Sequence, residues 1–161
     1  MPIPWSYVQS WNCITCGICC KDYSVVLGFN EWLNIIRTFG VESTIPSISK
    51  FYLRKRGDGT CVFLHKALNI WLCGLQNMKP KACKLWPFKI LDEPNFGRPD
   101  EASYVYKGRK FFIYADPFCL GIRWGNPAQE LMYKTLSELI EIALGLQERQ
   151  YCSTSKNLTN Q

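Results

Sequence analysis

Four cysteines within eight residues constrain this chain more than any other feature. Residues 13–20 read Cys-Ile-Thr-Cys-Gly-Ile-Cys-Cys, so Cys13, Cys16 and Cys19 recur at every third position and Cys20 follows directly. Cysteines at this interval can direct their sulfurs at one metal centre, and bacterial ferredoxins space three cluster ligands in the same way. Gly17 allows the tight backbone that such a loop needs. Because adjacent side chains tend to diverge, we predict that Cys20 serves a second centre or a different edge of a cluster.

The remaining cysteines extend this pattern along the chain. The sequence holds nine cysteines, and four that follow the first motif bring the predicted ligand set to eight: Cys61, Cys73, Cys83 and Cys119. Eight thiolates would fill two four-thiolate sites, occupied by zinc or by iron–sulfur clusters. The main centre is predicted to use Cys13, Cys16 and Cys19 with one remote cysteine. Cys152 is interpreted as a bystander thiol.

The expected redox state of these thiols follows from the compartment that the sequence indicates. Residues 1–6 lack the basic and apolar regions of a signal peptide, and no apolar stretch is long enough to cross a membrane. We therefore expect a cytoplasmic protein without a membrane partner. Thiols stay reduced there, so cysteine-rich spacing indicates metal or redox chemistry rather than disulfides.

Length and residue patterning predict one α+β domain over residues 1–152, stapled by metal, and a frayed polar tail over 153–161. The chain has 161 residues, 47% of them hydrophobic, which is enough for a core. Helices are expected at 31–38, capped by Asn30, at 79–85 as a short turn, and over the longer C-terminal segment 127–149. Strands are expected at 23–27, 61–64, 69–72, 88–91, 103–107 and 111–114, with Gly108 in a hairpin turn.

The order of these motifs resembles the CxxCxxCC, or YkgJ-type, zinc- or iron-chelating domain family. Beyond the first motif, the resemblance rests on Cys61-Val62-Phe63-Leu64, then Cys73, Pro80, Cys83 and Trp86-Pro87-Phe88, and finally Cys119-Leu120-Gly121. It covers about residues 11–125. It implies a metal site built from the eight cysteines. Flagellin lysine-N-methylases resemble the domain at these motifs, so an iron–sulfur module for protein lysine methylation is one implied alternative.

This chain departs from the family at two positions. Lys79-Pro80 stands where relatives often have Arg-Pro, and His65 stands where an acidic residue is common. Since His65 falls at the end of a predicted strand, we interpret it as a surface residue rather than as a ligand.

Thiolate donors favour zinc or iron–sulfur over magnesium, calcium or manganese. The ferredoxin-like spacing favours iron–sulfur, and whether the chain is an enzyme stays open. The formal charge of +6 would be largely offset by eight thiolates, which weakens a nucleic-acid interpretation.

Two basic segments have alternative interpretations. Lysines beside the cysteine block could offset thiolate charge: Lys79, Lys81, Lys84 and Lys89. The basic and aromatic segment 50–56 could bind a nucleic-acid strand, although a solvated face is the simpler interpretation. A zinc-stapled module for a protein or nucleic-acid partner is therefore a further alternative.

Overall fold

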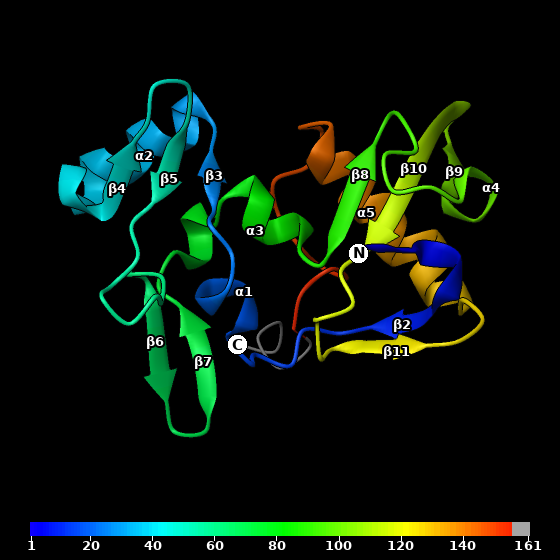
Figure 1. Ribbon diagram of the computed structural model, residues 1–161, viewed down its shortest axis with the longest axis horizontal. Helices are drawn as coiled ribbons and strands as arrows, with labels where there is room; N and C mark the ends of the chain where they lie inside the picture. The colour runs from blue at the N-terminus through cyan, green and yellow to red at the C-terminus, as the bar shows by residue number, and fades with distance from the viewer. Residues whose placement is uncertain (156–161) are drawn as a thin grey trace. The chain divides into compact units, whose positions relative to one another are not determined.

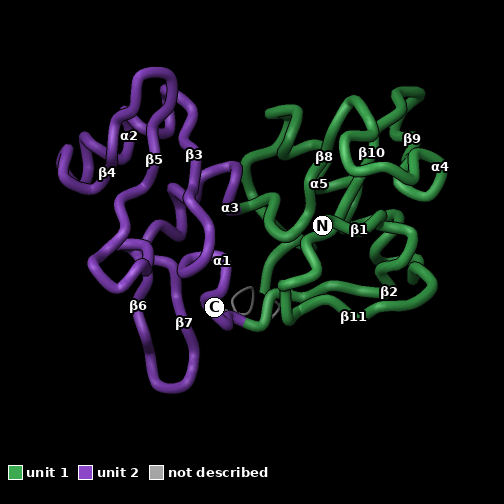
Figure 2. The backbone as a smooth tube through the Cα atoms, viewed as in Figure 1, with its two compact units in different colours: residues 1–14, 84–161 green, residues 15–83 purple. Residues whose placement is uncertain are grey.

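The computed structural model describes residues 1–155, and the chain divides into two compact units (Figure 2). Unit 1 is formed by residues 1–14 and 84–161, and unit 2 by residues 15–83. Short antiparallel strands and helices build both units, which confirms the predicted α+β class (Figure 1). The predicted tail spans 153–161, of which 156–161 lie outside the described residues.

Unit 1 is organised around β10 (Arg109–Ala115), which pairs antiparallel with three other strands (Figure 1). These are β1 (Ile3–Pro4), β8 (Phe88–Leu91) and β9 (Ser103–Tyr106). The hairpin between β9 and β10 turns at Lys107 and Gly108, which have φ values of 48° and 78°. Two successive positive φ angles are typical of a type I′ turn, so the predicted turn at Gly108 is confirmed.

A second strand pair and three helical segments complete unit 1. β2 (Val8–Trp11) pairs with β11 (Ile122–Trp124), and a 3-10 turn, Trp5–Tyr7, precedes β2. A short helix, α4 (Pro99–Ala102), leads into β9. The C-terminal helix begins with a π-helical segment, Leu131–Thr135, and continues as α5 (Leu136–Ala143). Its apolar face, including Leu136, Leu139 and Ile140, packs in one core with β8, β10 and β11.

Unit 2 contains a three-stranded sheet and a separate hairpin. The sheet has the order β3 (Val26–Leu27), β5 (Phe51–Leu53), β4 (Thr44–Pro46), and α2 (Phe29–Phe39) connects its first strand to a 3-10 turn, Val41–Ser43. The hairpin consists of β6 (Leu64–Ala67) and β7 (Ile70–Cys73). Two more helices, α1 (Ile18–Lys21) and α3 (Lys81–Leu85), and a 3-10 turn, Gln76–Met78, carry or flank cysteines.

Several predicted boundaries are wrong. The C-terminal helix spans 131–143 instead of 127–149, since Gly145 has a φ of 74° and reverses the chain. Gly28, not Asn30, caps α2, and its N–H donates to Glu31 Oε2 at 2.8 Å. The first hairpin strand begins at Leu64 rather than at Cys61. Within residues 1–155, the helices are too short and too polar to traverse a bilayer.

The buried carboxylate of Glu138 holds the segment that follows the C-terminal helix through hydrogen bonds. Glu138 Oε1 accepts hydrogen bonds from the N–H groups of Tyr151 and Ser153, at 2.9 and 3.0 Å, and from Ser153 Oγ at 2.5 Å. Its Oε2 accepts one from the N–H of Cys152 at 2.8 Å. Ser153 is buried at this point.

Candidate metal centre

The first cysteine motif forms a tight loop that leads into α1. Gly17 has a φ of 76°, and its carbonyl accepts a hydrogen bond from the N–H of Cys20 at 3.0 Å. A Cβ atom at Gly17 would lie 3.0 Å from Trp71 Cγ, so the indole side chain of Trp71, on β7, packs directly on this glycine. The prediction that Gly17 supplies the loop's backbone freedom is confirmed.

Backbone hydrogen bonds join this loop to distant parts of unit 2. The N–H of Trp71 donates to the carbonyl of Thr15 at 3.0 Å, and the N–H of Cys61 donates to the carbonyl of Cys20 at 2.7 Å. Lys55 Nζ donates to the carbonyl of Lys21 at 2.9 Å. Cys20 and Cys61 are forty-one positions apart in the sequence, but this hydrogen bond makes them neighbours in space.

Cys61 and Cys73 come to the same end of the β6–β7 hairpin. Leu64 pairs with Cys73 in the ladder, and the N–H of Leu64 donates to the carbonyl of Cys61 at 3.0 Å. The N–H of Gly74 donates to the carbonyl of Phe63 at 2.7 Å, which closes this end. Because residues 61–63 turn back in this way, only Leu64 of the predicted strand 61–64 belongs to β6.

One arginine holds the Cys61 turn. The guanidinium of Arg56 donates from Nη1 to the carbonyls of Cys61 and Leu64, both at 3.0 Å, and from Nη2 to the carbonyl of Val62 at 2.6 Å. Sequence reasoning placed Arg56 in a basic patch and missed this role. The nearby turn signal Asp58-Gly59 is the only local hint of it, since it folds the chain back from Arg56 toward Cys61.

Two other cations of segment 50–56, Arg54 and Lys55, also donate hydrogen bonds to backbone carbonyls. Arg54 donates from Nε to the carbonyl of Glu42 at 2.5 Å, and Lys55 binds the carbonyl of Lys21 as described above. These contacts give the basic residues a structural role within unit 2. They do not supply support for a nucleic-acid partner.

The sulfurs of Cys19 and Cys20 lie 3.9 Å apart. The expectation that these adjacent side chains diverge is therefore wrong: both residues lie in α1, and their sulfurs are close together. Hydrogen bonding from the Cys20 thiol, assisted by the positive charge of Lys79, lowers the pKa of Cys19 to about 7, against the opposing effect of burial. The same hydrogen bond, together with burial, raises the pKa of Cys20.

Three further thiols of unit 2 lie within the field of this pair: Cys61, which is buried, and Cys73 and Cys83, which are half-buried. Burial raises the pKa of Cys61, of Cys73 and of Cys83, and charge on Cys19 raises all three further. Lys79 opposes this rise at Cys73 and Cys83. Its positive charge thus favours the thiolate form of these two thiols. We call the five cysteines the thiol cluster: Cys19, Cys20, Cys61, Cys73 and Cys83.

Unit 1 brings Cys13 and Cys119 to one end of the β2–β11 pair. Cys119 is part of the buried core of this unit and Cys13 packs against that core. The N–H of Asn12 donates to the carbonyl of Gly121 at 3.1 Å. A Cβ atom at Gly121 would lie 2.2 Å from the carbonyl oxygen of Asn12, so only glycine fits this crossing. The Cys-x-Gly spacing thus has a packing reason.

Three remaining candidates are not members of the thiol cluster: His65, Cys152 and Cys16. His65 is exposed on β6, which confirms its interpretation as a surface residue. Cys152 lies in unit 1 beside Glu138, whose charge adds to burial in raising the pKa of that thiol. Cys16 belongs to unit 2 and lies in the loop before α1. No three His, Cys, Asp or Glu side chains within residues 1–155 are already placed to hold one metal ion.

The donor set itself fits zinc or iron. All members of the thiol cluster are free thiols, and thiolate sulfur is the ligand that both metals accept in proteins. The fold and these residues define a cysteine-rich α+β protein.

Comparison with protein families agrees with that class. Residues 12–120 match the model of the family described as "CxxCxxCC: Putative zinc- or iron-chelating domain". The chain belongs to this family, as its motifs indicated, and membership supports metal binding. No curated protein and no solved structure matches the chain.

Proposed function

We propose that this protein binds metal through the thiol cluster of unit 2, and that the metal is an iron–sulfur cluster. The observation that carries the proposal is a set of backbone contacts between separate cysteine segments: the N–H of Cys61 donates to the carbonyl of Cys20, and Cys61 and Cys73 lie at one end of the β6–β7 hairpin. Burial with four other thiols is unfavourable for thiolates unless a cation compensates them. A bound metal centre would provide that compensation.

The residues have different roles in this proposal. Members of the thiol cluster supply sulfur ligands, Arg56 orients the Cys61 turn through three carbonyls, and Lys79 adds positive charge. When bound, an iron–sulfur cluster would supply electron transfer at potentials set by burial and hydrogen bonding. The ferredoxin-like spacing of Cys13, Cys16 and Cys19 supports this choice of metal.

The sequence-derived ligand set is wider than the thiol cluster. Cys13, Cys16 and Cys119 remain proposed ligands, with Cys119 as the remote partner of Cys13 because both lie at one end of the β2–β11 pair. A second centre, or a shared one, would use them.

A structural zinc site is a second candidate, and one distance favours it. Four thiolates at about 2.3 Å around zinc stand roughly 3.8 Å from one another. The Cys19 and Cys20 sulfurs are 3.9 Å apart, close to that separation. In a cubane cluster the thiolates stand much wider.

The metal content of anaerobically purified protein tests the proposal. We expect iron and acid-labile sulfide in equal amounts, with little zinc. Cys20→Ser and Cys61→Ser should lose most of the metal, whereas the matched control Cys152→Ser should keep it. Stoichiometric zinc without sulfide would replace the first candidate by the second. Protein that keeps neither metal after reconstitution would contradict both.

A further inference from the structure

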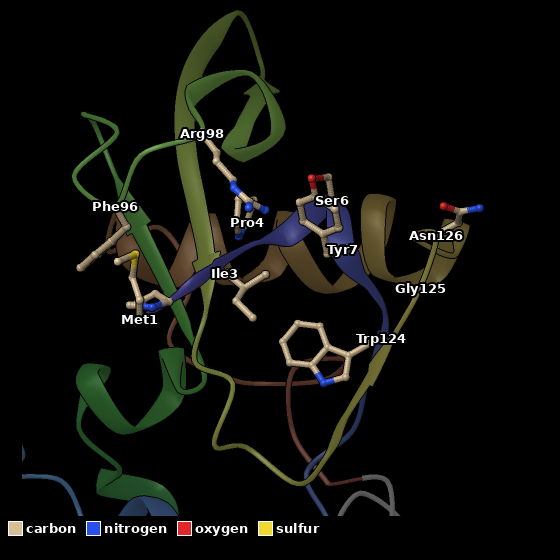
Figure 3. Close-up of a pocket in the computed structure, with 11 residues that line it drawn as sticks. Met1, Ile3, Pro4, Ser6, Tyr7, Phe96, Arg98, Trp124, Gly125 and Asn126 are labelled. Atoms are coloured by element: carbon tan, nitrogen blue, oxygen red, sulfur yellow. The ribbon is translucent and has the colours of Figure 1, made fainter.

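Unit 1 contains a cavity of about 620 Å³ that involves none of the cysteines (Figure 3). Proteins commonly bind small molecules in cavities of roughly 300–1,000 Å³. The N-terminal segment, the loop before α4 and the end of β11 form its walls. The volume is therefore suited to a small organic ligand.

Aromatic rings form much of the cavity wall. Tyr7 and Trp124 are 41% and 45% exposed, and Phe96 lines the cavity while its ring meets Tyr114 edge-on. In Figure 3 the Trp124 indole points from β11 toward Ile3. Flat, partly exposed rings beside an apolar side chain favour a flat apolar group as the occupant.

Arg98 has the only cationic side chain among the described residues that line the cavity. Its guanidinium carbon lies 5.6 Å from the centroid of the Tyr7 ring. The two ion pairs formed by residues 1–155, Lys107–Glu141 and Arg109–Asp92, do not use it, and no acidic side chain of that range lines the cavity. Its charge is thus available to an anion.

The backbone at Arg98 is in a strained conformation. Arg98 has φ 50° and ψ 57°, the left-handed region that non-glycine residues rarely adopt. Such strain persists where the surrounding structure holds the residue in place, and it is frequent at ligand sites. Ser6, another lining residue, has a buried Oγ without a hydrogen-bond partner among the described residues. Polar groups in an otherwise apolar wall fix ligand orientation.

We propose that this cavity binds a small aromatic carboxylate. Its ring would lie against Tyr7 and Trp124, and its carboxylate would pair with the guanidinium of Arg98. The planar guanidinium of Arg98 can pair with a carboxylate through two parallel N–H···O hydrogen bonds. The proposed chemistry does not depend on metal binding, since no cysteine lines the cavity.

Titration of the full chain with matched naphthalene probes tests this inference. The probes are 2-naphthoate, the neutral 2-naphthylmethanol and the cationic 2-naphthylmethylamine, and binding is measured by calorimetry and ligand-observed NMR. We expect 2-naphthoate to bind about tenfold more tightly than the alcohol, and the amine to bind most weakly.

Two arginine variants make the test specific. Arg98→Asn removes the guanidinium, and asparagine tolerates a positive φ, so the loop should keep its fold. This variant should weaken the binding of 2-naphthoate about tenfold and leave the binding of the alcohol unchanged. The control is Arg123→Asn, because Arg123 is an exposed arginine of β11 that does not line the cavity. Absent binding of every probe, equal binding of acid and alcohol, or an equal loss in Arg123→Asn would overturn the proposal.

Discussion

Replacing Arg56 by glutamine should weaken metal binding more than it weakens the fold. The guanidinium joins the carbonyls of Cys61, Val62 and Leu64 at 2.6 to 3.0 Å, so it sets the direction in which the Cys61 turn faces. Glutamine is shorter and has one NH2 group, so it cannot span the three carbonyls. The turn would then be free to move the Cys61 sulfur away from the other thiols.

The size of the expected stability loss depends on how exposed the Arg56 side chain is. A hydrogen bond to a charged group contributes about 1.5–3 kcal/mol when shielded from water. Arg56 is exposed, so water replaces much of this, and we expect the free energy of unfolding to fall by about 1–2 kcal/mol. Groups that orient metal ligands typically change metal affinity by about 10- to 100-fold, so we expect at least a tenfold loss.

Arg54→Gln provides the matched control. Arg54 also donates to backbone carbonyls, at Glu42 and Thr44, but these lie at β4 and the turn before it rather than at a cysteine. Urea unfolding of the apoprotein measures stability, and Zn²⁺ titration against a chromophoric chelator measures the affinity of the thiols. Arg56→Lys should behave like the glutamine variant, since lysine keeps the charge without the planar fork. Equal loss of Zn²⁺ affinity in Arg54→Gln and Arg56→Gln would refute the reasoning.

Three further perturbations have defined outcomes. Gly121→Ala should lower the free energy of unfolding by about 1–3 kcal/mol in urea, because the new Cβ would lie 2.2 Å from the Asn12 carbonyl oxygen. Glu138→Gln should cost about 2–3 kcal/mol in the same assay, since it removes the charge that binds three successive N–H groups and the hydroxyl of Ser153. In metal-free protein, alkylation of Cys19 by iodoacetamide should rise steeply as the pH passes about 7, because its lowered pKa places the thiolate above that value.

Each of these outcomes has a control in the same chain. Gly57→Ala should cost little, because no atom lies within 4 Å of the added Cβ. Glu148→Gln changes an exposed carboxylate and should stay within about 0.5 kcal/mol of the parent. Cys19→Ser should abolish the alkylation step near pH 7. The predictions fail if a control variant matches its partner, or if that step persists without Cys19.

Local patterns predicted the elements whose own residues decide their structure. The strand at 88–91 and the hairpin around Gly108 were recognised from β-prone residues and a turn glycine, and both are present. The end of α2 at Gly40 was also predictable, since its φ of 90° stops a helix. Short-range backbone preferences decide these features.

Errors arose where distant contacts override local preference. Residues 61–63 were expected to belong to a strand but form a turn, because Arg56 binds the carbonyls of Cys61 and Val62 there. The C-terminal helix ends at Ala143 although a helical pattern continues, because the following chain is held by Glu138. Neither Arg56 nor Glu138 belongs to a sequence motif that would indicate its role.

The sequence by itself determined the donor chemistry, because thiol identity and the three-residue spacing of Cys13, Cys16 and Cys19 are local properties. Only the tertiary structure decided which thiols are neighbours. The hydrogen bond from Cys61 to Cys20 joins segments far apart in the chain, and the sulfurs of Cys19 and Cys20 lie 3.9 Å apart within α1. Such pairings depend on loop closure and packing of the whole unit, which no short motif specifies.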